Sequence, residues 1–211
     1  MQLVIGRKSR IVSQTKTRFF VASNELIHKN KDWINNFDKI IFLSYAREKG
    51  DTQQLLVDLA KYLVRTVNKR IVFLSSDHVF NGKRGYYSVY DKAEPNTDYG
   101  LCKVELENIF FEHTVLRFTT TGPSQSNRHL MYEMALNNQI QTVYERHYFS
   151  PVSTAEINFF LNGAHIKSGI YHLVGDRVSK AAYLRQIGVN TSSILKFDYT
   201  FKDHSLLAGF K

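Results

Sequence analysis

The stretch RIVFLSSDHVF, residues Arg70–Phe80, indicates the fold class. It begins with four apolar side chains, Ile71–Leu74, and changes at once to the hydroxyl groups of Ser75 and Ser76. An apolar run without polar alternation is typical of a strand that a sheet buries on both faces. The stretch therefore predicts a buried strand whose carboxyl end carries two serines.

Similar apolar runs occur elsewhere in the chain: QLVIG (2–6), RFFVAS (18–23), KIIFLSY (39–45) and TVLRFT (114–119). Two segments between the runs have helical periodicity. In Asp51–Val67 the leucines form one stripe and Asp51 is placed as a cap, and in Thr97–His113 we expect Leu101 and Phe110 to face the core, together with Val104 and Ile109. Strands that alternate with helices predict a parallel, doubly wound sheet.

After about residue 119 the pattern is less regular. We expect a helix near 128–137, short strands, and a helix near 179–186. The fold class is thus α/β: a Rossmann-like parallel sheet flanked by helices, with a small C-terminal substrate lobe. The 211 residues are interpreted as a single domain, with a core at 1–118 and mixed core and lobe segments at 119–211.

Composition excludes some classes of protein and leaves others open. Hydrophobic residues make up 43% and charged residues 22%, which is typical of a globular chain without membrane insertion. The start is apolar first and basic second, the reverse of a secretory signal, so we expect a cytoplasmic protein. The net charge of +9 suits anionic nucleotides, nucleic acid or no specific partner. Because the charges are scattered, we expect no nucleic-acid partner.

Tyr99 and Lys103 lie four residues apart in the second helical segment, so they share one helix face. A cation beside a phenol favours the phenolate, which makes the tyrosine a better proton donor and acceptor near neutral pH. A serine hydroxyl at the end of the neighbouring strand could bind the same substrate oxygen. The spacing also occurs by chance in many helices, and a strand-end serine often binds only backbone.

The longer stretch VFLSSDHVFNGKRGYYSVYDKAEPNTDYGLCKVELE, residues 72–107, resembles the extended short-chain dehydrogenase/reductase superfamily. It is most similar to the branch of dTDP-4-dehydrorhamnose reductases. There, a strand ends in a Ser-Thr-Asp-Tyr-Val-Phe-like motif, a Gly-containing loop and an acidic-Pro segment follow, and Tyr-Gly-x-x-Lys opens a helix. The likeness extends more loosely from about Ile40 to Leu207.

This resemblance implies a proton-transfer triad. Ser76 would orient the substrate carbonyl, Tyr99 would donate or accept the proton, and Lys103 would hold the nicotinamide ribose and lower the pKa of the tyrosine. The implied activity is an NAD(P)-dependent oxidoreductase acting on a nucleotide-linked keto-sugar, in the synthesis of a surface polysaccharide or deoxysugar. The resemblance implies a nucleotide sugar as the substrate. A homo-oligomer or a complex with a partner enzyme is left open by the sequence.

The cofactor loop departs from the family pattern Gly-x-x-Gly-x-x-Gly. Of its three glycines only Gly6 is present, and eleven residues separate it from Arg18. Either Arg7, Lys8 and Arg10 replace the glycine amides as phosphate ligands for NADP or NAD, or the cofactor site has decayed. In the second case the protein would be a non-catalytic relative that binds a nucleotide or a protein.

Three further residues are candidates for substrate binding. His78 stands where the family has tyrosine, and Arg128 and Arg146 lie in the half where the family binds its substrate. Each is equally compatible with an ordinary loop or surface position. No histidines have the spacing of a metal site, so no metal is expected. An epimerase or dehydratase that uses the same triad is the third possible function.

Overall fold

The computed structural model describes residues 1–6, 18–23, 26, 32–43, 50–121, 134–135, 137–163, 166–194 and 196–211. Most of the helix expected at 128–137 lies outside these residues. All five strands expected from the apolar runs are present, which confirms that part of the sequence analysis.

The main sheet is a parallel sheet with one antiparallel edge strand. Its spatial order is β14-β10-β5-β4-β3-β1-β2. The strands are β1 (Gln2–Ile5), β2 (Arg18–Val21), β3 (Lys39–Phe42), β4 (Arg70–Leu74), β5 (Thr114–Arg117), β10 (Gly169–His172) and β14 (Gly209–Phe210). Only β14 runs antiparallel to its neighbour. The strand order reverses between β1 and β3, so the ligand crevice of such a sheet is expected at their carboxyl ends.

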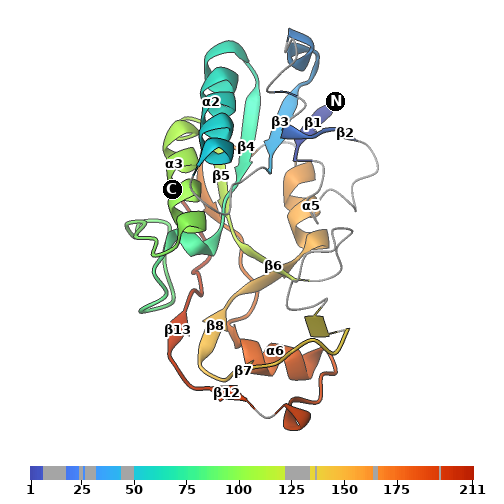
Figure 1. Ribbon diagram of the computed structural model, residues 1–211. Helices are drawn as coiled ribbons and strands as arrows, with labels where there is room; N and C mark the ends of the chain where they lie inside the picture. Colours follow the sequence, from blue (N-terminus) through green and yellow to red (C-terminus); the bar gives the residue numbers. More distant parts are fainter. Residues whose placement is uncertain are drawn as a thin grey trace.

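Helices cover both faces of the sheet, as the unbroken apolar runs predicted. Figure 1 shows α2 (Asp51–Thr66) and α3 (Asp98–Ile109) on one face and α5 (Thr154–Asn162) on the other. Along β4, Ile71 and Phe73 belong to the core beneath α2 and α3, whereas Val72 and Leu74 pack with the core beneath α5. This alternation follows from the period of two along a strand.

Hydroxyl side chains precede three of the four α-helices that the structure describes. Thr97, Ser153 and Ser179 each accept a hydrogen bond from a backbone N–H of the first helical turn, at the start of α3, α5 and α6 (Lys180–Gln186) respectively. The cap predicted at Asp51 is wrong by one residue. Gly50 precedes α2, and Asp51 is its first residue, where its charge still suits the helix dipole.

Of the four apolar residues expected to face the core, Phe110 is buried and Val104 and Ile109 pack against core clusters, but Leu101 does not. Leu101 is 40% exposed, which contradicts its predicted place in the core, although Phe110 is buried as expected. The buried side includes Lys103 and Glu107, which are 2% and 6% exposed. The helix therefore turns two charged groups inward together with most of its apolar residues, and the sequence prediction is wrong at Leu101.

The second half of the chain supplies the far edge of the sheet and a small lobe. Figure 1 shows the lobe below the sheet, and α6, expected near 179–186, lies in it. Its strands are β6 (Thr119–Thr121), β7 (Val143–Tyr144), β8 (His147–Phe149), β9 (Pro151–Ser153), β11 (Val178–Ser179), β12 (Phe197–Asp198) and β13 (Lys202–Asp203).

The described residues of the whole chain also include the short 3-10 turns η2 (Asp32–Asn36), η3 (Asp77–Val79) and η4 (Thr191–Ser193). Within the described ranges, no helix is long and apolar enough to cross a membrane.

Candidate active site at the carboxyl ends of the strands

The two serines at the end of β4 have different partners. Ser76 precedes η3, and its Oγ accepts a hydrogen bond from the backbone N–H of His78 (3.2 Å) and donates one to Oδ1 of Asp77 (2.9 Å). Ser75 instead donates to Glu107 on α3. Both serines are buried, so the hydroxyl expected to bind substrate at Ser76 also stabilises the first turn of the loop.

Gly100 brings this loop against the start of α3. A Cβ at position 100 would collide with the carbonyl oxygen of His78 and with the side chain of Pro95. The Tyr-Gly pair thus has a steric explanation, because only glycine allows η3 to pack this closely on the helix. The close packing places the loop that begins at Ser76 beside Tyr99.

Tyr99 lies between two groups that bear on its chemistry. The Nζ of Lys103 is 5.8 Å from the centre of its ring, and the ring of His78 is 5.7 Å away, edge to face. Lys103 donates a hydrogen bond to the carbonyl oxygen of Leu74 (2.6 Å). Burial lowers the pKa of Lys103 to about 8, while Cys102 and Glu107 act in the opposite direction. The hydrogen bond to Leu74 therefore holds the amine at the end of β4. There it lies close enough to Tyr99 for its positive charge to favour the phenolate form of that side chain.

Behind Lys103 lies a group of buried polar side chains, here called the buried network, which comprises Ser75, Glu107, Arg117 and His172. Arg117 donates two hydrogen bonds to the Glu107 carboxylate, from Nε (2.9 Å) and Nη2 (2.7 Å). Ser75 donates to Oε1 of the same carboxylate. Ions that are buried away from water need such hydrogen bonds, because the desolvation of each unpaired ion would lower the stability by several kcal/mol.

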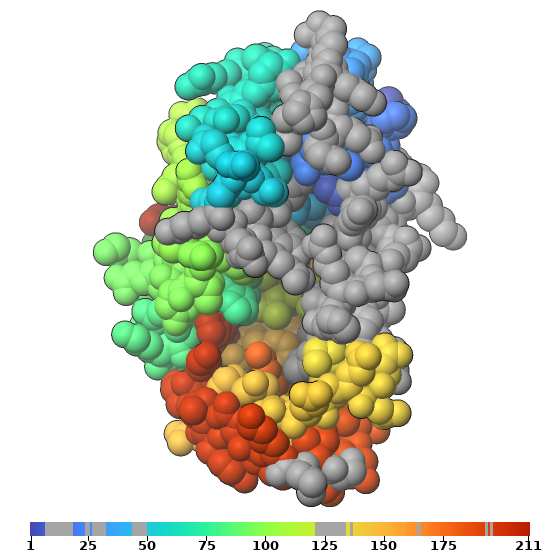
Figure 2. Space-filling view, in the orientation of Figure 1, coloured from blue at the N-terminus to red at the C-terminus, as the bar shows by residue number. Residues whose placement is uncertain are grey.

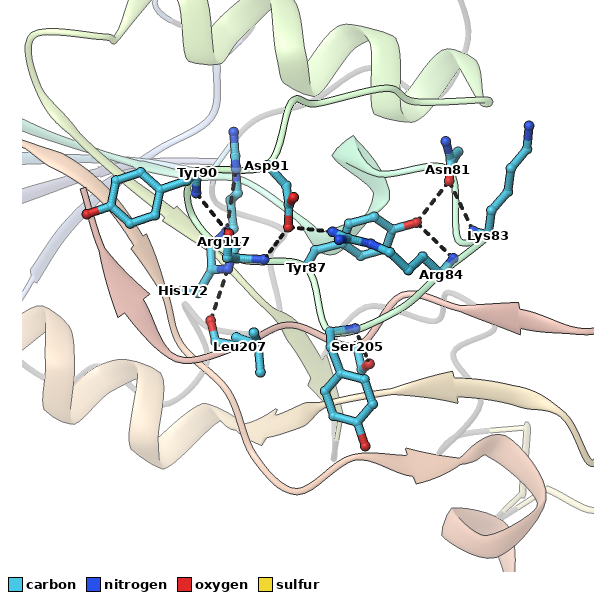
Figure 3. A network of polar contacts seen from close by, with 12 residues as sticks. Asn81, Lys83, Arg84, Tyr87, Tyr90, Asp91, Arg117, His172, Ser205 and Leu207 are labelled. Atoms are coloured by element: carbon cyan, nitrogen blue, oxygen red, sulfur yellow. Dashed lines mark hydrogen bonds and ion pairs between the residues drawn. The ribbon is translucent and has the colours of Figure 1, made fainter.

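His172 completes the buried network on β10. Figure 3 shows it between Arg117 and the backbone of Leu207: Arg117 Nη1 lies 3.4 Å from Nε2, and Nδ1 lies 3.2 Å from the Leu207 carbonyl oxygen. Burial, followed by the charge of Arg117, lowers the pKa of His172 to about 4. The ring is therefore neutral at pH 7, with Nδ1–H donating to Leu207 and Nε2 accepting from Arg117.

The loop after η3 is held against the C-terminal segment. In Figure 3 the Tyr87 hydroxyl donates to Asn81 (2.9 Å), and the backbone N–H of Tyr86 donates to Ser205 (2.9 Å). A Cβ at Gly82, whose φ is +74°, would meet the ring of His204. These contacts fix His204 beside the loop that carries His78.

In front of the strand ends lies a second group, here called the cationic cluster: Asp77, His78, Lys180, Lys202 and His204. The rings of His78 and His204 stack at 4.8 Å. Burial lowers the pKa of His204 to about 4; Asp77 raises it, whereas His78, Lys180 and Lys202 lower it further. Nε2 of His204 has no hydrogen-bond partner among the described residues. One carboxylate thus faces several cationic or basic groups.

A cavity of about 360 Å³ adjoins the cationic cluster through Lys180. It is lined by Met134, Ile140, Gln141, Thr142, Tyr144, Lys180 and Leu184. The Lys180 amine lies 5.5 Å from the centre of the Tyr144 ring. Figure 2 shows the surface hollowed between the green part of the chain, which includes α3, and the yellow-to-red lobe. The lining is mostly apolar, with a few polar groups and the cation of Lys180, which suits an organic ligand that carries negative charge.

The predicted cofactor residues are only partly within the described chain. Gly6 ends β1 with a φ of 119°, and its N–H donates to the carbonyl oxygen of Val21 (3.0 Å). Arg7, Lys8 and Arg10 lie outside the described residues.

Of the substrate-binding candidates, Arg128 also lies outside the described residues. His78 is exposed beside Tyr99, whereas Arg146 is exposed in the lobe with its guanidinium over Phe201 (5.6 Å). The structure thus brings His78 and Lys103 beside Tyr99, and Ser76 binds the backbone of His78.

Sequence reasoning missed Glu107, Arg117 and His204. The only signal for Glu107 was its spacing of four from Lys103, which is more often a solvent-exposed ion pair. His204 comes from the far end of the chain, and no local pattern links it to His78. Within the described part of the chain, no group of three metal-ligating side chains gathers, and a metal site was not expected.

Residues 54–193 match the family described as the RmlD substrate binding domain. The match spans well over half of the chain, and the chain therefore belongs to this family. The resemblance to dTDP-4-dehydrorhamnose reductases is confirmed. The first crossover, with its single glycine, precedes the matched residues. No curated protein sequence gives a significant match.

Solved structures of similar fold include sugar-nucleotide enzymes. A dTDP-4-dehydrorhamnose reductase from Bacillus anthracis, in complex with NADP, has a TM-score of 0.73 at 16% identity over 99% of this chain and 90% of that one. A reductase from Clostridium acetobutylicum gives 0.69 at 18%, over 99% and 90%. A dTDP-glucose 4,6-dehydratase from Streptomyces venezuelae, with NAD bound, gives 0.69 at 18%, over 99% and 89%. The predicted Rossmann-like fold is confirmed.

Proposed function

We propose that this protein is an NAD(P)H-dependent reductase of a nucleotide-linked keto-sugar, in the synthesis of a surface polysaccharide or deoxysugar. The observation that carries the proposal is the position of Tyr99, between the buried amine of Lys103 and the loop that begins at Ser76. Related structures that hold NADP or NAD support the class of cofactor.

In this function, side chains of the protein transfer the proton to the substrate. The Tyr99 hydroxyl donates its proton to the substrate oxygen, and the charge of Lys103 favours the phenolate that remains. The Ser76 hydroxyl, already turned toward Asp77, would bind the same oxygen after leaving its present acceptor. A reduced nicotinamide, when bound, supplies the hydride. Gly6, with its left-handed backbone at the end of β1, fits the close approach of a pyrophosphate there.

The cationic cluster and the adjoining cavity support an anionic nucleotide sugar as the substrate. Lys180 belongs to both, so a diphosphate at the cluster would place its nucleoside in the cavity. Among the described residues, Nε2 of His204 has no hydrogen-bond partner, so it can form a further hydrogen bond to this ligand. This arrangement lies on the lobe side of Tyr99, because His78 contacts both Tyr99 and His204.

Calorimetric titration with NADPH and NADH tests the cofactor. We expect NADPH to bind and its affinity to fall with salt, because side-chain charges replace two glycine amides. The double variant Arg7→Ala/Lys8→Ala should weaken binding by about 100-fold, taking ~1.5 kcal/mol, or about 10-fold, for each charged contact. The matched control is Lys61→Ala/Arg65→Ala, which removes two exposed charges from α2 and should have little effect.

One observation favours a second function, that of a non-catalytic relative that binds a nucleotide or a protein. Twelve residues, 6–17, join β1 to the parallel strand β2, and they contain one glycine. A crossover of this length leaves room for only a short helix. No detectable binding at millimolar NADPH or NADH would favour this function over the reductase. Tight binding whose affinity changes neither with salt nor in the Arg7/Lys8 variant would support the reductase and overturn the role given to these two residues.

A further inference from the structure

We propose that Glu107 is a positioning residue that holds the Lys103 amine in its charged form and fixes the end of β4, which carries Ser76. The inference rests on the proposed reductase function for its catalytic consequence. Its structural basis is that Lys103 and Glu107, one turn apart on α3, bind successive residues of the same strand end. Lys103 donates to the Leu74 carbonyl oxygen, and Glu107 accepts from Ser75.

The carboxylate joins α3 to the sheet as well as to the strand end. Arg117, from β5, donates two hydrogen bonds to it, and both side chains are nearly buried, at 4% and 6% exposed. His172, from β10, fixes Arg117 from behind (Figure 3). Three neighbouring strands therefore contribute to the position of a single carboxylate.

The same carboxylate is the counter-charge for Lys103. The titratable groups around this amine are Tyr99, Cys102 and Glu107 on α3, with Arg117 and His172 behind them on β5 and β10. From β4 it meets the Leu74 carbonyl oxygen and the face of Phe73 at 4.8 Å. Cys102 and Glu107 both raise the pKa of Lys103 against the effect of burial, and Glu107 also pairs with Arg117, so its carboxylate offsets part of the cost of burying two cations together.

The charge of Lys103 in turn acts on Tyr99. Without the carboxylate, Arg117 keeps its proton because a guanidinium does not titrate in proteins. The buried amine is the group that can respond, by losing its proton at a lower pH. A neutral Lys103 no longer favours the Tyr99 phenolate, so the alkaline limit of activity should move to lower pH.

The test is an NMR titration of the cofactor-free protein labelled with ¹³C at the lysine ε-carbons. The Lys103 signal is assigned by its absence from Lys103→Arg. We expect Glu107→Gln to lower the pKa of Lys103 by about one unit, as for loss of a neighbouring opposite charge. Glu105→Gln is the matched control, since that carboxylate on the same helix is exposed and binds Gln53. Glu107→Asp, which keeps the charge, should recover part of the shift.

Activity gives the second readout. In Glu107→Gln the alkaline limb of the pH profile should move down by the same unit, with the profile of Glu105→Gln unchanged. If Glu107→Gln does not fold, the double variant Glu107→Gln/Arg117→Gln removes the buried pair together, which proteins often tolerate. A smaller downward shift is then expected, because the positive charge of Arg117 is lost with the carboxylate. A folded variant in which Lys103 titrates as in the parent protein overturns the inference. A shifted Lys103 in a protein that never reduces a keto-sugar overturns the proposed function instead.

Discussion

The buried network and the cationic cluster both adjoin the neighbours of Tyr99, and their charges are balanced differently. In the buried network, Arg117 meets a carboxylate in a bidentate pair, and His172 stays neutral to accept from it. In the cationic cluster, Asp77 faces two histidines and two lysines, and Nε2 of His204 has no partner among the described residues. The first group needs no further ion, whereas the second has positive charge in excess.

This difference separates two tasks that a reductase must perform. A closed, paired network keeps Lys103 and the end of β4 in one geometry, since every buried polar group already has its partner. An open cluster with excess positive charge gains from an anion, because a bound phosphate would supply the missing counter-charge. Tyr99 is in contact with both regions, through Lys103 and through His78.

The largest effect on activity is expected at Tyr99, which adjoins both regions. Tyr99→Phe removes the hydroxyl and leaves both regions in place, so NADPH-dependent reduction should fall by about 10³-fold, the usual range for general acid–base catalysis. Cofactor affinity should stay within about 2-fold, because the ring remains. Steady-state rates and calorimetry measure the two quantities. Tyr90→Phe, at a ring that is 71% exposed, is the control. Full activity in Tyr99→Phe would disprove the triad.

In the buried network, acid should act through His172. Because its folded pKa of about 4 lies below the ordinary 6.5, the unfolded chain binds this proton more tightly, and stability falls as the pH drops from 6.5 to 4. The shift amounts to about 3 kcal/mol of unfolding free energy at pH 4. His172→Asn should escape this loss, so its stability relative to the parent protein improves by that amount between pH 7 and pH 4.

Denaturant unfolding at both pH values measures the change. The pKa of His204 is also lowered to about 4, but this residue is present in both proteins, so its contribution cancels in the comparison. An acid response of His172→Asn equal to that of the parent would mean that His172 is not the group that titrates.

Lys103 should give a pH dependence of the same sign, but in an alkaline window. Its folded pKa of about 8 lies below the ordinary 10.5, so the unfolded chain again binds the proton more tightly, and stability rises as the pH increases from 8 to 10.5. Lys103→Met cannot gain in this way. The unfolding free energy of the parent relative to this variant should therefore rise by roughly 2–3 kcal/mol between pH 7 and pH 10. Lys61→Met, exposed on α2, should show no such change.

The sequence predicted the region in front of Tyr99 better than the one behind it. Ser76, Tyr99 and Lys103 belong to short motifs whose spacing gives their geometry directly, and each lies where the strand and helix patterns place it. Glu107 and Arg117 come from separate elements, and their burial depends on the rotation of α3. The apolar pattern placed Leu101 wrongly in the core, because the inward face of this helix is partly charged.

His172 and His204 give the smallest and most direct comparison, since each has a pKa lowered to about 4 by burial, one in each region. Addition of UDP, a nucleoside diphosphate without sugar, should raise the pKa of His204 by about one unit, because a phosphate near the cationic cluster favours the charged ring. His172 is enclosed by Arg117 and Leu207 and should not respond. Histidine ¹H–¹³C NMR titrations, assigned with His172→Asn and His204→Asn, measure both values in one sample. Equal shifts at the two rings would indicate a change in the whole fold, and no shift at His204 under saturating UDP would remove the cationic cluster as the diphosphate site.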